Sequence, residues 1–256
     1  MKEKIRVALL GASGRMGQCI TRLAASSDSL EIVARVDVRD DELEPPVISD
    51  LSQAPDFDVL VDFSTPAATT AALEVVANRR CAWLVATTGL SPDLRTQILA
   101  LASKCPIFIA SNTSLGIALM QRLAAQAAAM LADWDCEILE THHHHKVDAP
   151  SGTALTLAHT VADVHRQMGR HPEIVTDRSA LHEKRNPASI GVASLRGGTV
   201  AGEHAVIWFG QNEQFELKHT AENREIFAHG ALKIASWLSK QNPGTYSMAQ
   251  MLDDMM

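Results

Sequence analysis

The sequence predicts an α/β protein in two parts: a Rossmann-type domain built on a parallel sheet, and an α+β domain with a mixed or antiparallel sheet. Over the first half of the chain, short apolar runs alternate with helical patterns, as in a parallel sheet with helices on both faces. A glycine-rich turn, Gly11 to Gly17, joins the first run to the first helix. After about residue 113, β-rich runs follow one another without helices between them, which is typical of an antiparallel or mixed sheet.

The first half supplies five strands and three helices. Two helices begin with the same signal, a hydroxyl residue that caps the helix followed by proline at its first position, at Thr65-Pro66 and Ser91-Pro92. The expected order is strand Ile5–Leu10, helix Arg15–Ala25, strands Glu31–Val38 and Val59–Phe63, helix Pro66–Arg79, strand Cys81–Ala86, a helix from Pro92, and strand Pro106–Ala110.

The second half starts with a long Ala/Leu/Met helix and contains most of the closely spaced strands. We expect helix Gly116–Leu131, strand Asp135–Thr141, helix Thr153–Met168, strands Ile190–Leu195, Thr199–Phe209 and Phe215–Thr220, and a last helix Arg224–Leu238. We place the domain boundary near residue 113. Local pattern alone does not decide whether the last helix returns to the first domain.

The bulk composition narrows the class of protein. Of 256 residues, 46% are apolar, enough to bury a full core, and the net charge of −7 argues against a general binder of nucleic acid or anionic membrane. No stretch approaches the roughly 18 apolar residues of a membrane helix. Four widely spaced cysteines include no C-x-x-C pair, which favours reduced thiols and a cytoplasmic protein.

The glycine turn is the first candidate site. Its spacing is G-x-x-G-x-x-G rather than the commoner G-x-G-x-x-G, but a strand precedes it and a helix follows. Glycines allow close approach of a pyrophosphate to the helix N-terminus. Asp37, twenty residues past Gly17, is placed to bind the adenosine ribose and should repel a 2′-phosphate, whereas Arg39 would attract one. The alternative is a tight turn without a ligand.

Two further loops follow strands and contain small polar residues, Ala86-Thr87-Thr88-Gly89 and Ser111-Asn112-Thr113-Ser114. The carboxyl ends of parallel strands form the ligand-binding edge of such a sheet. We therefore expect these loops to contact the nicotinamide and its ribose. The alternative for each loop is ordinary turn chemistry.

The most informative stretch runs from Glu140 to Thr153 and contains four consecutive histidines, His142 to His145. An internal purification tag, a zinc site and a solvated loop are the alternatives to a catalytic segment, and no Cys or H-E-x-x-H pattern completes a zinc shell. Strand alternation would point His142 and His144 one way and the two other histidines the opposite way.

The catalytic interpretation uses more of this stretch. A histidine titrates near neutral pH and can act as a general acid. Lys146 can hold an anion or donate a proton. Ser151, Gly152 and Thr153 open a helix, whose N-terminus is an anion site. Together they suit reduction of a carboxylated, unsaturated substrate, and we expect the segment to face the reactive edge of a nicotinamide.

The chain resembles the 4-hydroxy-tetrahydrodipicolinate reductase (dihydrodipicolinate reductase) family over nearly its whole length. The most specific match is E-x-H-H-x-x-K-x-D-x-P-S-G-T-A, which runs from Glu140 to Ala154. Supporting segments, in the family's order, are Gly11–Gly17, Thr87-Thr88-Gly89, Ser111–Ser114, Ser194-Leu195-Arg196-Gly197-Gly198, Gly202-Glu203-His204 and Pro243-Gly244-Thr245-Tyr246.

The resemblance implies that NADH or NADPH gives a hydride to the ring of the dehydrated substrate, a small dicarboxylate, on the diaminopimelate route to lysine. It implies His142 as proton donor or acceptor and Lys146 as second proton donor. Substrate contacts would be His143, Ser151, Gly152 and Thr153. Cofactor contacts would be Gly11, Ala12, Ser13, Gly14, Arg15, Met16, Asp37, Ala86, Thr87, Thr88, Ala110, Ser111, Asn112 and Thr113, with no metal.

The resemblance also implies a homotetramer built through the second domain. Residues 224–256 would return to the Rossmann domain of residues 1–113, leaving 114–223 for substrate binding and tetramerisation. Two departures from the family are Val38, where many members have Arg, and Ala86, where many have Gly. The first weakens NADPH use.

Two rival functions remain at this point. A semialdehyde dehydrogenase with a similar two-domain plan needs a nucleophilic cysteine in a loop, and only Cys136 lies near the active strand of the second domain. A non-catalytic module that senses NAD(P) or binds a metal would bind its ligand without turnover.

Overall fold

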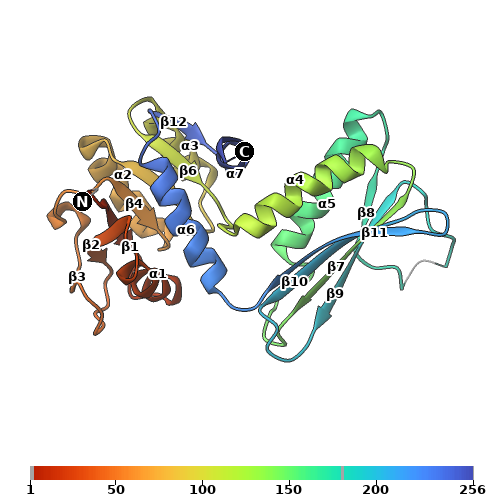
Figure 1. Ribbon diagram of the computed structural model, residues 1–256, viewed down its shortest axis with the longest axis horizontal. Coiled ribbons are helices and arrows are strands. Elements are labelled where there is room, and N and C mark those ends of the chain that lie inside the picture. The colour runs from red at the N-terminus through yellow and green to blue at the C-terminus, as the bar shows by residue number, and fades with distance from the viewer. Residues whose placement is uncertain (1–2, 180–181, 256) are drawn as a thin grey trace. The chain divides into compact units, whose positions relative to one another are not determined.

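The computed structural model describes residues 3–179 and 182–255 and divides into two compact units (Figure 1). The first unit runs to Leu115 and resumes at Glu225, and the second is Gly116–Arg224. The last part of the chain therefore packs with the first.

The first unit is built on a seven-stranded sheet in which every neighbouring pair is parallel. The strand order is β12-β6-β5-β4-β1-β2-β3. From β1 the chain moves outward on one side to β2 and β3, and then returns to β4 on the other side. The order thus reverses between β1 and β4, where open α/β sheets bind ligands. The strands are β1 (Ile5–Leu10), β2 (Leu30–Val36), β3 (Val47–Ile48), β4 (Val59–Asp62), β5 (Ala82–Val85), β6 (Pro106–Ile109) and β12 (Gly244–Tyr246).

Helices cover both faces of this sheet, as the alternation predicts. Along β1, Val7 and Leu9 face one apolar cluster, and Ala8 and Leu10 face the other. The first cluster takes in α1 (Arg15–Ala25), α6 (Glu225–Leu238) and α7 (Met248–Asp254), and the second α2 (Pro66–Arg79) and α3 (Pro92–Ala100). The proline signals are confirmed, because the hydroxyls of Thr65 and Ser91 accept the N–H of Ala68 and Leu94.

Some predicted bounds are corrected. The strand expected to reach Val38 ends at Val36, so Asp37 is the first residue beyond it. The short strands β3, β12 and, in the second unit, β8 (Glu173–Val175) were not predicted, because two or three residues show no measurable alternation.

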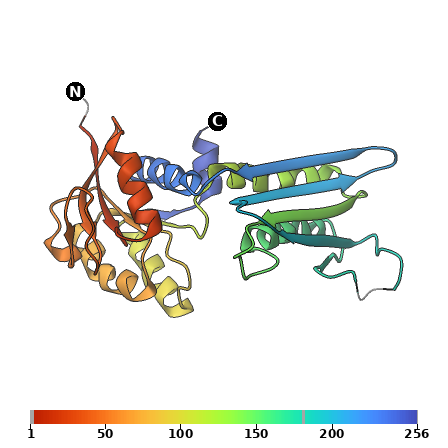
Figure 2. The ribbon, with the colours of Figure 1, turned by 90° about the horizontal axis from the view of Figure 1, so that it is seen from below.

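The second unit contains a five-stranded sheet in the order β11-β10-β7-β9-β8. The central strand β7 pairs antiparallel with β10 and parallel with β9, so the predicted mixed sheet is confirmed. Both helices lie on one side of it (Figure 2). The elements are α4 (Leu115–Met130), β7 (Asp135–His142), α5 (Gly152–Gln167), β8 (Glu173–Val175), β9 (Ser189–Arg196), β10 (Gly202–Phe209) and β11 (Gln214–Ala221).

Strand β7 alternates strictly between its two faces. Cys136, Ile138, Glu140 and His142 are buried, and the residues between them are partly exposed. The first two pack under α4 and α5. Because side chains repeat with a period of two along a strand, Glu140 and His142 lie on this same helix-covered face, at the end of β7.

Candidate functional site

The glycine turn lies at the switch point of the first sheet. Gly11 has φ of +82°, and a Cβ there would stand 2.5 Å from the carbonyl oxygen of Phe63, directly after β4. A Cβ at Gly17 would stand 2.3 Å from the Gly11 carbonyl oxygen. Side chains at either position would force the turn apart, so both glycines keep β1, β4 and α1 closely packed.

The start of α1 fits a phosphate group. Gly14 caps the helix without any side-chain hydrogen bond, and the first turn contains no acidic residue. A Cβ at Gly14 would meet only the Gly11 carbonyl oxygen, at 3.2 Å. The first N–H groups of a helix have no partner within the helix and carry partial positive charge. The arrangement therefore suits the pyrophosphate of a dinucleotide.

Asp37 is held beside this turn by backbone groups. Its Oδ2 accepts the N–H of Ser13 at 3.0 Å, and its Oδ1 accepts those of Val38 at 2.8 Å and Arg39 at 3.2 Å. The Ser13 hydroxyl donates to the Arg39 carbonyl at 2.6 Å. The predicted ribose acid and the glycine turn thus form one rigid group.

In each of the two polar loops, one threonine hydroxyl forms a hydrogen bond within the protein. Thr87 is buried, and its hydroxyl donates to Asp62 at 2.7 Å. Thr113 is buried, and its hydroxyl donates to the Phe227 carbonyl at 2.7 Å. Thr88 and Ser111 are exposed, and Ala86 and Ala110 are buried. What these loops offer a cofactor is therefore their backbone and their exposed residues.

The histidine run does not continue the strand. β7 ends at His142, and His144 and His145 form a turn, so the predicted alternation of all four side chains is wrong. The connection from β9 to β10 binds the backbone where β7 ends. The Gly197 N–H donates to the His142 carbonyl at 2.9 Å, and the His143 N–H donates to the Val200 carbonyl at 2.8 Å.

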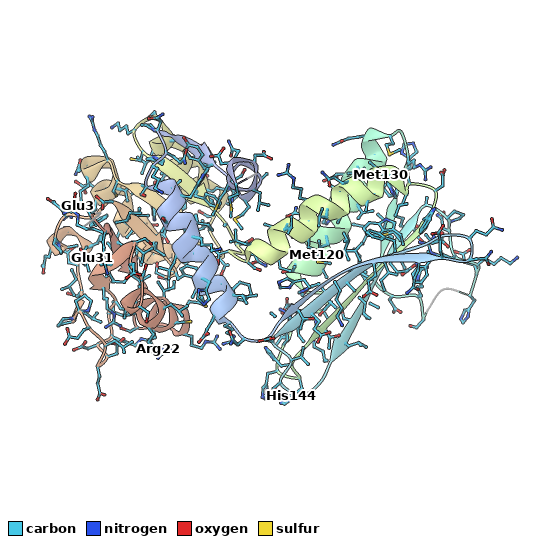
Figure 3. The ribbon with its side chains drawn as sticks, in the orientation of Figure 1. Glu3, Arg22, Glu31, Met120, Met130 and His144 are labelled. Carbon is cyan, nitrogen blue, oxygen red and sulfur yellow. The ribbon has the colours of Figure 1, made fainter. Side chains whose placement is uncertain are left out.

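His142 is the buried histidine of the run, and His144 lies exposed at its outer end (Figure 3). His143 is half-buried. Partial burial lowers the pKa of His143, and the nearby positive charge of Arg224 adds to that effect.

Glu140 connects His142, Arg196 and Ser151 through its carboxylate. Its carboxylate is fully buried and lies 2.5 Å from His142 Nδ1. Arg196 donates to both oxygens, at 2.8 and 2.7 Å, and the Ser151 N–H donates at 3.1 Å. A carboxylate on Nδ1 places the proton on that nitrogen, which leaves Nε2 for chemistry.

The charge state of Glu140 follows from these contacts. Burial acts to raise its pKa, but the hydrogen bonds from Arg196 and its other donors outweigh burial and lower the pKa to about 2. The carboxylate is therefore ionised at neutral pH. A two-pronged arginine–carboxylate pair also fixes geometry, and Arg196 donates further to the Asp148 carbonyl at 2.6 Å, which ties the loop to β9.

A second histidine packs against the first. The rings of His142 and His204 meet edge to face with centroids 5.1 Å apart, and His204 Nε2 lies 3.1 Å from the Ser151 hydroxyl. Burial lowers the pKa of His204 to about 4, with the neighbouring His142 adding to it, so this ring is uncharged at neutral pH. Ser151 also accepts the N–H of Ala154 as the cap of α5.

Lys146 and the start of α5 lie in the same segment of the chain. Lys146 Nζ pairs with Asp148 at 2.8 Å. The first turn of α5 contains no acidic residue, and a Cβ at Gly152 would meet nothing within 4 Å. Gly152 is exposed and Thr153 half-buried, whereas the Ser151 side chain is buried and acts as a support. The start of α5 is open to an anion.

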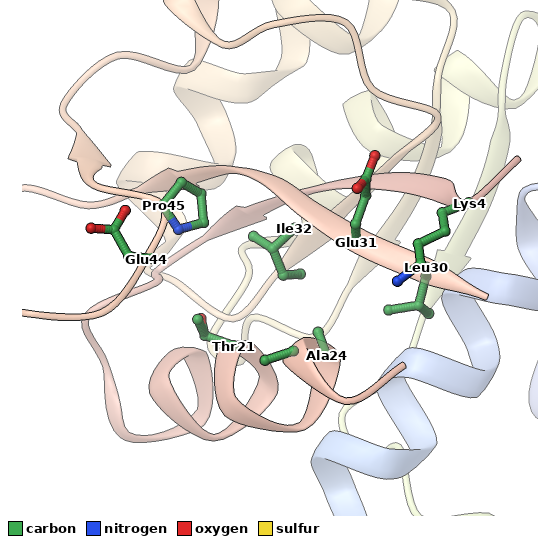
Figure 4. Close-up of a pocket in the computed structure, with 9 residues that line it drawn as sticks. Lys4, Thr21, Ala24, Leu30, Glu31, Ile32, Glu44 and Pro45 are labelled. Atoms are coloured by element: carbon green, nitrogen blue, oxygen red, sulfur yellow. The ribbon is translucent and has the colours of Figure 1, made fainter. Parts of the chain in front are cut away.

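A pocket elsewhere in the first unit does not coincide with these groups. It lies between α1 and the beginning of β2, with Lys4, Thr21, Glu31 and Glu44 in its lining (Figure 4). That is the amino-terminal edge of the sheet, opposite to the edge with the glycine turn. Its position therefore argues against this pocket being the site that binds the dinucleotide.

One alternative loses support. Cys136 is 2% exposed, and burial raises the pKa of its thiol to about 12, so it is unsuited to act as the nucleophile of a semialdehyde dehydrogenase. Over residues 3–179 and 182–255, no group of three or more His, Cys, Asp or Glu side chains is arranged to hold a metal ion. In the same part of the chain, no helix is both long and apolar enough to cross a membrane.

Glu140, Arg196 and His204 stand within the family's motifs, but the sequence alone predicted no role for them. Alternation along β7 was the available signal for Glu140, because it stands two residues before His142 on the same face. The contacts of the other two depend on strand pairing, since Arg196 and His204 lie 56 and 64 residues further along the chain than Glu140.

Both units match models of a known protein family. The family model described as dihydrodipicolinate reductase, N-terminus, covers residues 5–113, and that described as dihydrodipicolinate reductase, C-terminus, covers residues 116–252. A curated relative from Zymomonas mobilis, named 4-hydroxy-tetrahydrodipicolinate reductase, is 42% identical over 254 residues and 98% of each chain. One of the same name from Archaeoglobus fulgidus is 37% identical over 97% of this chain and 100% of its own.

Solved structures agree with that assignment. A dipicolinate-bound dihydrodipicolinate reductase from Paenisporosarcina superposes with a TM-score of 0.79 and 26% identity, over 96% of this chain and 98% of its own. An aspartate semialdehyde dehydrogenase from Vibrio cholerae has a TM-score of 0.52 and 11% identity, over 93% of this chain and 99% of its own. The second likeness concerns the fold alone.

Proposed function

This chain belongs to the dihydrodipicolinate reductase family, and on that premise we propose how its residues carry out the family's reaction. It is an NAD(P)H-dependent oxidoreductase that reduces dihydrodipicolinate, the dehydrated form of 4-hydroxy-tetrahydrodipicolinate, to tetrahydrodipicolinate for diaminopimelate and lysine synthesis. The observation that carries the site assignment is the contact of His142 with buried Glu140 at the end of β7, directly before the segment that contains Lys146 and leads to the start of α5.

The first unit holds the dinucleotide. Gly11 to Met16 would receive the pyrophosphate at the start of α1, and Asp37 the adenosine ribose. Residues 86–88 and 110–113 would contact the nicotinamide half. The cofactor supplies the hydride when bound. Asp37 disfavours a 2′-phosphate and exposed Arg39 attracts one, so we propose that both NADH and NADPH are used, with NADH preferred.

The second unit supplies protons and binds the substrate. His142 is held by Glu140 so that Nε2 exchanges the proton that must accompany hydride addition. A Cβ at Gly202 would stand 3.0 Å from that nitrogen, so the glycine keeps the space beside it open. A positioned acid of this kind accelerates a reaction about 10²–10⁴-fold.

Three groups would bind the substrate's carboxylates. Lys146, half-buried beside Asp148, offers an ammonium group. Gly152 and Thr153 offer the start of α5, where partial positive charge favours an anion. His143 lies three residues before Lys146 and nine before Gly152 in the chain. A dipicolinate-bound relative supports a ligand with two carboxylates. Ser151 contributes by capping α5 and meeting His204 rather than by direct contact.

The open face of the second sheet supports self-association. Leu195 and Phe209 are 53% and 42% exposed, and Leu139 and Ile207 are half-buried on this same face. Large exposed apolar side chains gathered on one surface mark interaction sites. We propose a homotetramer formed through this face, in the cytoplasm.

The test couples this protein to the preceding synthase, with pyruvate and aspartate semialdehyde as starting materials. NADH or NADPH absorbance should fall only when the protein is present. His142→Gln and Lys146→Ala should each reduce turnover at least about a hundredfold without weakening NADH binding. His144→Gln, at the exposed outer end of the loop, is the matched control and should retain full turnover. Folded protein that oxidises neither cofactor would refute the function.

A further inference from the structure

A fully buried carboxylate, that of Asp62, lies at the switch point of the first sheet. Asp62 ends β4, and its register partners are Leu10 of β1 and Val85 of β5. The glycine turn follows Leu10, and the Ala86-Thr87-Thr88 loop follows Val85. Asp62 therefore stands between the loops assigned to the two halves of the dinucleotide.

Every contact of this carboxylate is with a donor. Its Oδ1 accepts the Ser64 hydroxyl at 2.5 Å, the Thr87 hydroxyl at 2.7 Å and the Ser64 N–H at 3.0 Å. Its Oδ2 accepts the Thr69 hydroxyl at 2.7 Å. The Thr87 oxygen in turn accepts the Ser64 N–H at 3.1 Å. One side chain thus joins the turn after β4, helix α2 and the loop after β5.

The donors are all neutral groups, so they compensate the cost of burying a charge without forming an ion pair. Burial raises the pKa of Asp62, and the hydrogen bonds from Ser64, Thr69 and Thr87 oppose that effect. A sheet end needs no acid for packing alone. The network instead orients Thr87, and with it the backbone of exposed Thr88.

We propose that Asp62 is a positioning residue for the nicotinamide half of the dinucleotide, acting through Thr87. This inference rests on the proposed function, because it takes the loop after β5 as the nicotinamide site. Loss of the carboxylate should release that loop and leave the adenosine half of the site, at Asp37 and the glycine turn, unchanged.

The test compares two ligands. NADH uses both halves of the site, whereas ADP-ribose lacks the nicotinamide. In Asp62→Asn an amide nitrogen replaces one of the two acceptor oxygens, so the side chain can no longer accept all four hydrogen bonds. The dissociation constant of NADH should rise about tenfold, the worth of one lost hydrogen bond, while that of ADP-ribose should change less than about twofold. Equal weakening of both ligands, or of neither, would overturn the proposal.

A double-mutant cycle guards against a general structural effect. Thr87→Val removes the hydroxyl that links the loop to Asp62, and it should also weaken NADH selectively. Combining it with Asp62→Asn should add little, because both changes break one connection. Additive losses would contradict the route through Thr87. If Asp62→Asn does not fold, Thr87→Val alone must show the selective loss of NADH.

These measurements need no substrate, so they separate the two proposals. Wild-type protein that binds NADH but turns over no substrate would overturn the reductase function and leave this inference standing. If the wild-type protein turns over substrate but neither variant loses NADH binding selectively, the inference fails and the reductase function stands.

Discussion

Replacing Glu140 by glutamine tests the core of the site, because the substitution keeps the shape of the side chain and removes its charge. The carboxylate orients His142 at Nδ1 and receives both prongs of Arg196. Glutamine has one acceptor oxygen for these donors. We therefore expect the imidazole to lose its fixed proton position and the guanidinium to lose its counter-charge.

The structure sets the size of the effect on stability. The Glu140 pKa falls from its ordinary 4.5 to about 2 on folding, which corresponds to about 3 kcal/mol of stability. Because the folded pKa is the lower one, this contribution is complete at neutral pH and is lost as the pH falls from about 4.5 toward 2. Removing one partner of a buried ion pair costs a similar amount, about 3–5 kcal/mol.

The assay combines urea unfolding with turnover. The variant should be less stable than the wild type by about 3 kcal/mol at pH 7 and by less than half of that near pH 3. Its turnover at saturating cofactor should fall about 10²–10⁴-fold, the contribution of a positioned acid. Glu140→Asp, which keeps the charge, should recover part of the stability.

Glu137→Gln is the matched control. Glu137 lies on the same strand but on the opposite face, 30% exposed and paired with Arg178 and Arg185. Its replacement should leave turnover at the wild-type level. Full activity in Glu140→Gln, or an equal loss in Glu137→Gln, would refute the role assigned to the buried carboxylate.

Three further outcomes are expected. Val38 is 92% exposed, so Val38→Arg should cost little stability and raise kcat/KM for NADPH relative to NADH about tenfold; an unchanged ratio would contradict the ribose-site assignment. Gly202→Ala places a Cβ 3.0 Å from His142 Nε2 and should lower kcat about tenfold without changing the KM for NADH, a result that steady-state kinetics checks. Asp148→Asn frees Lys146 from an ion pair whose acid is 59% exposed, so the substrate KM should fall at most about fivefold, the worth of an exposed pair; a rise would count against Lys146 as an anion ligand.

Local sequence determined those features that depend on residues close together in the chain. Short apolar and β-branched runs placed the core strands, and hydroxyl–proline pairs marked the starts of α2 and α3. The glycines at positions 11 and 17 were predictable because only a residue without Cβ fits such close backbone contacts. The histidine–lysine segment stood out because its residue types share one kind of chemistry.

Tertiary structure alone decided what each of those groups does. Arg196 reaches Glu140 from 56 residues away, and His204 reaches Ser151 from 53 residues away. These contacts exist because β9 and β10 pair on either side of β7 in one particular register. Register depends on how whole faces pack rather than on neighbouring residues. For that reason the contacts of Arg196 with Glu140 and of His204 with Ser151 became visible only in the folded chain.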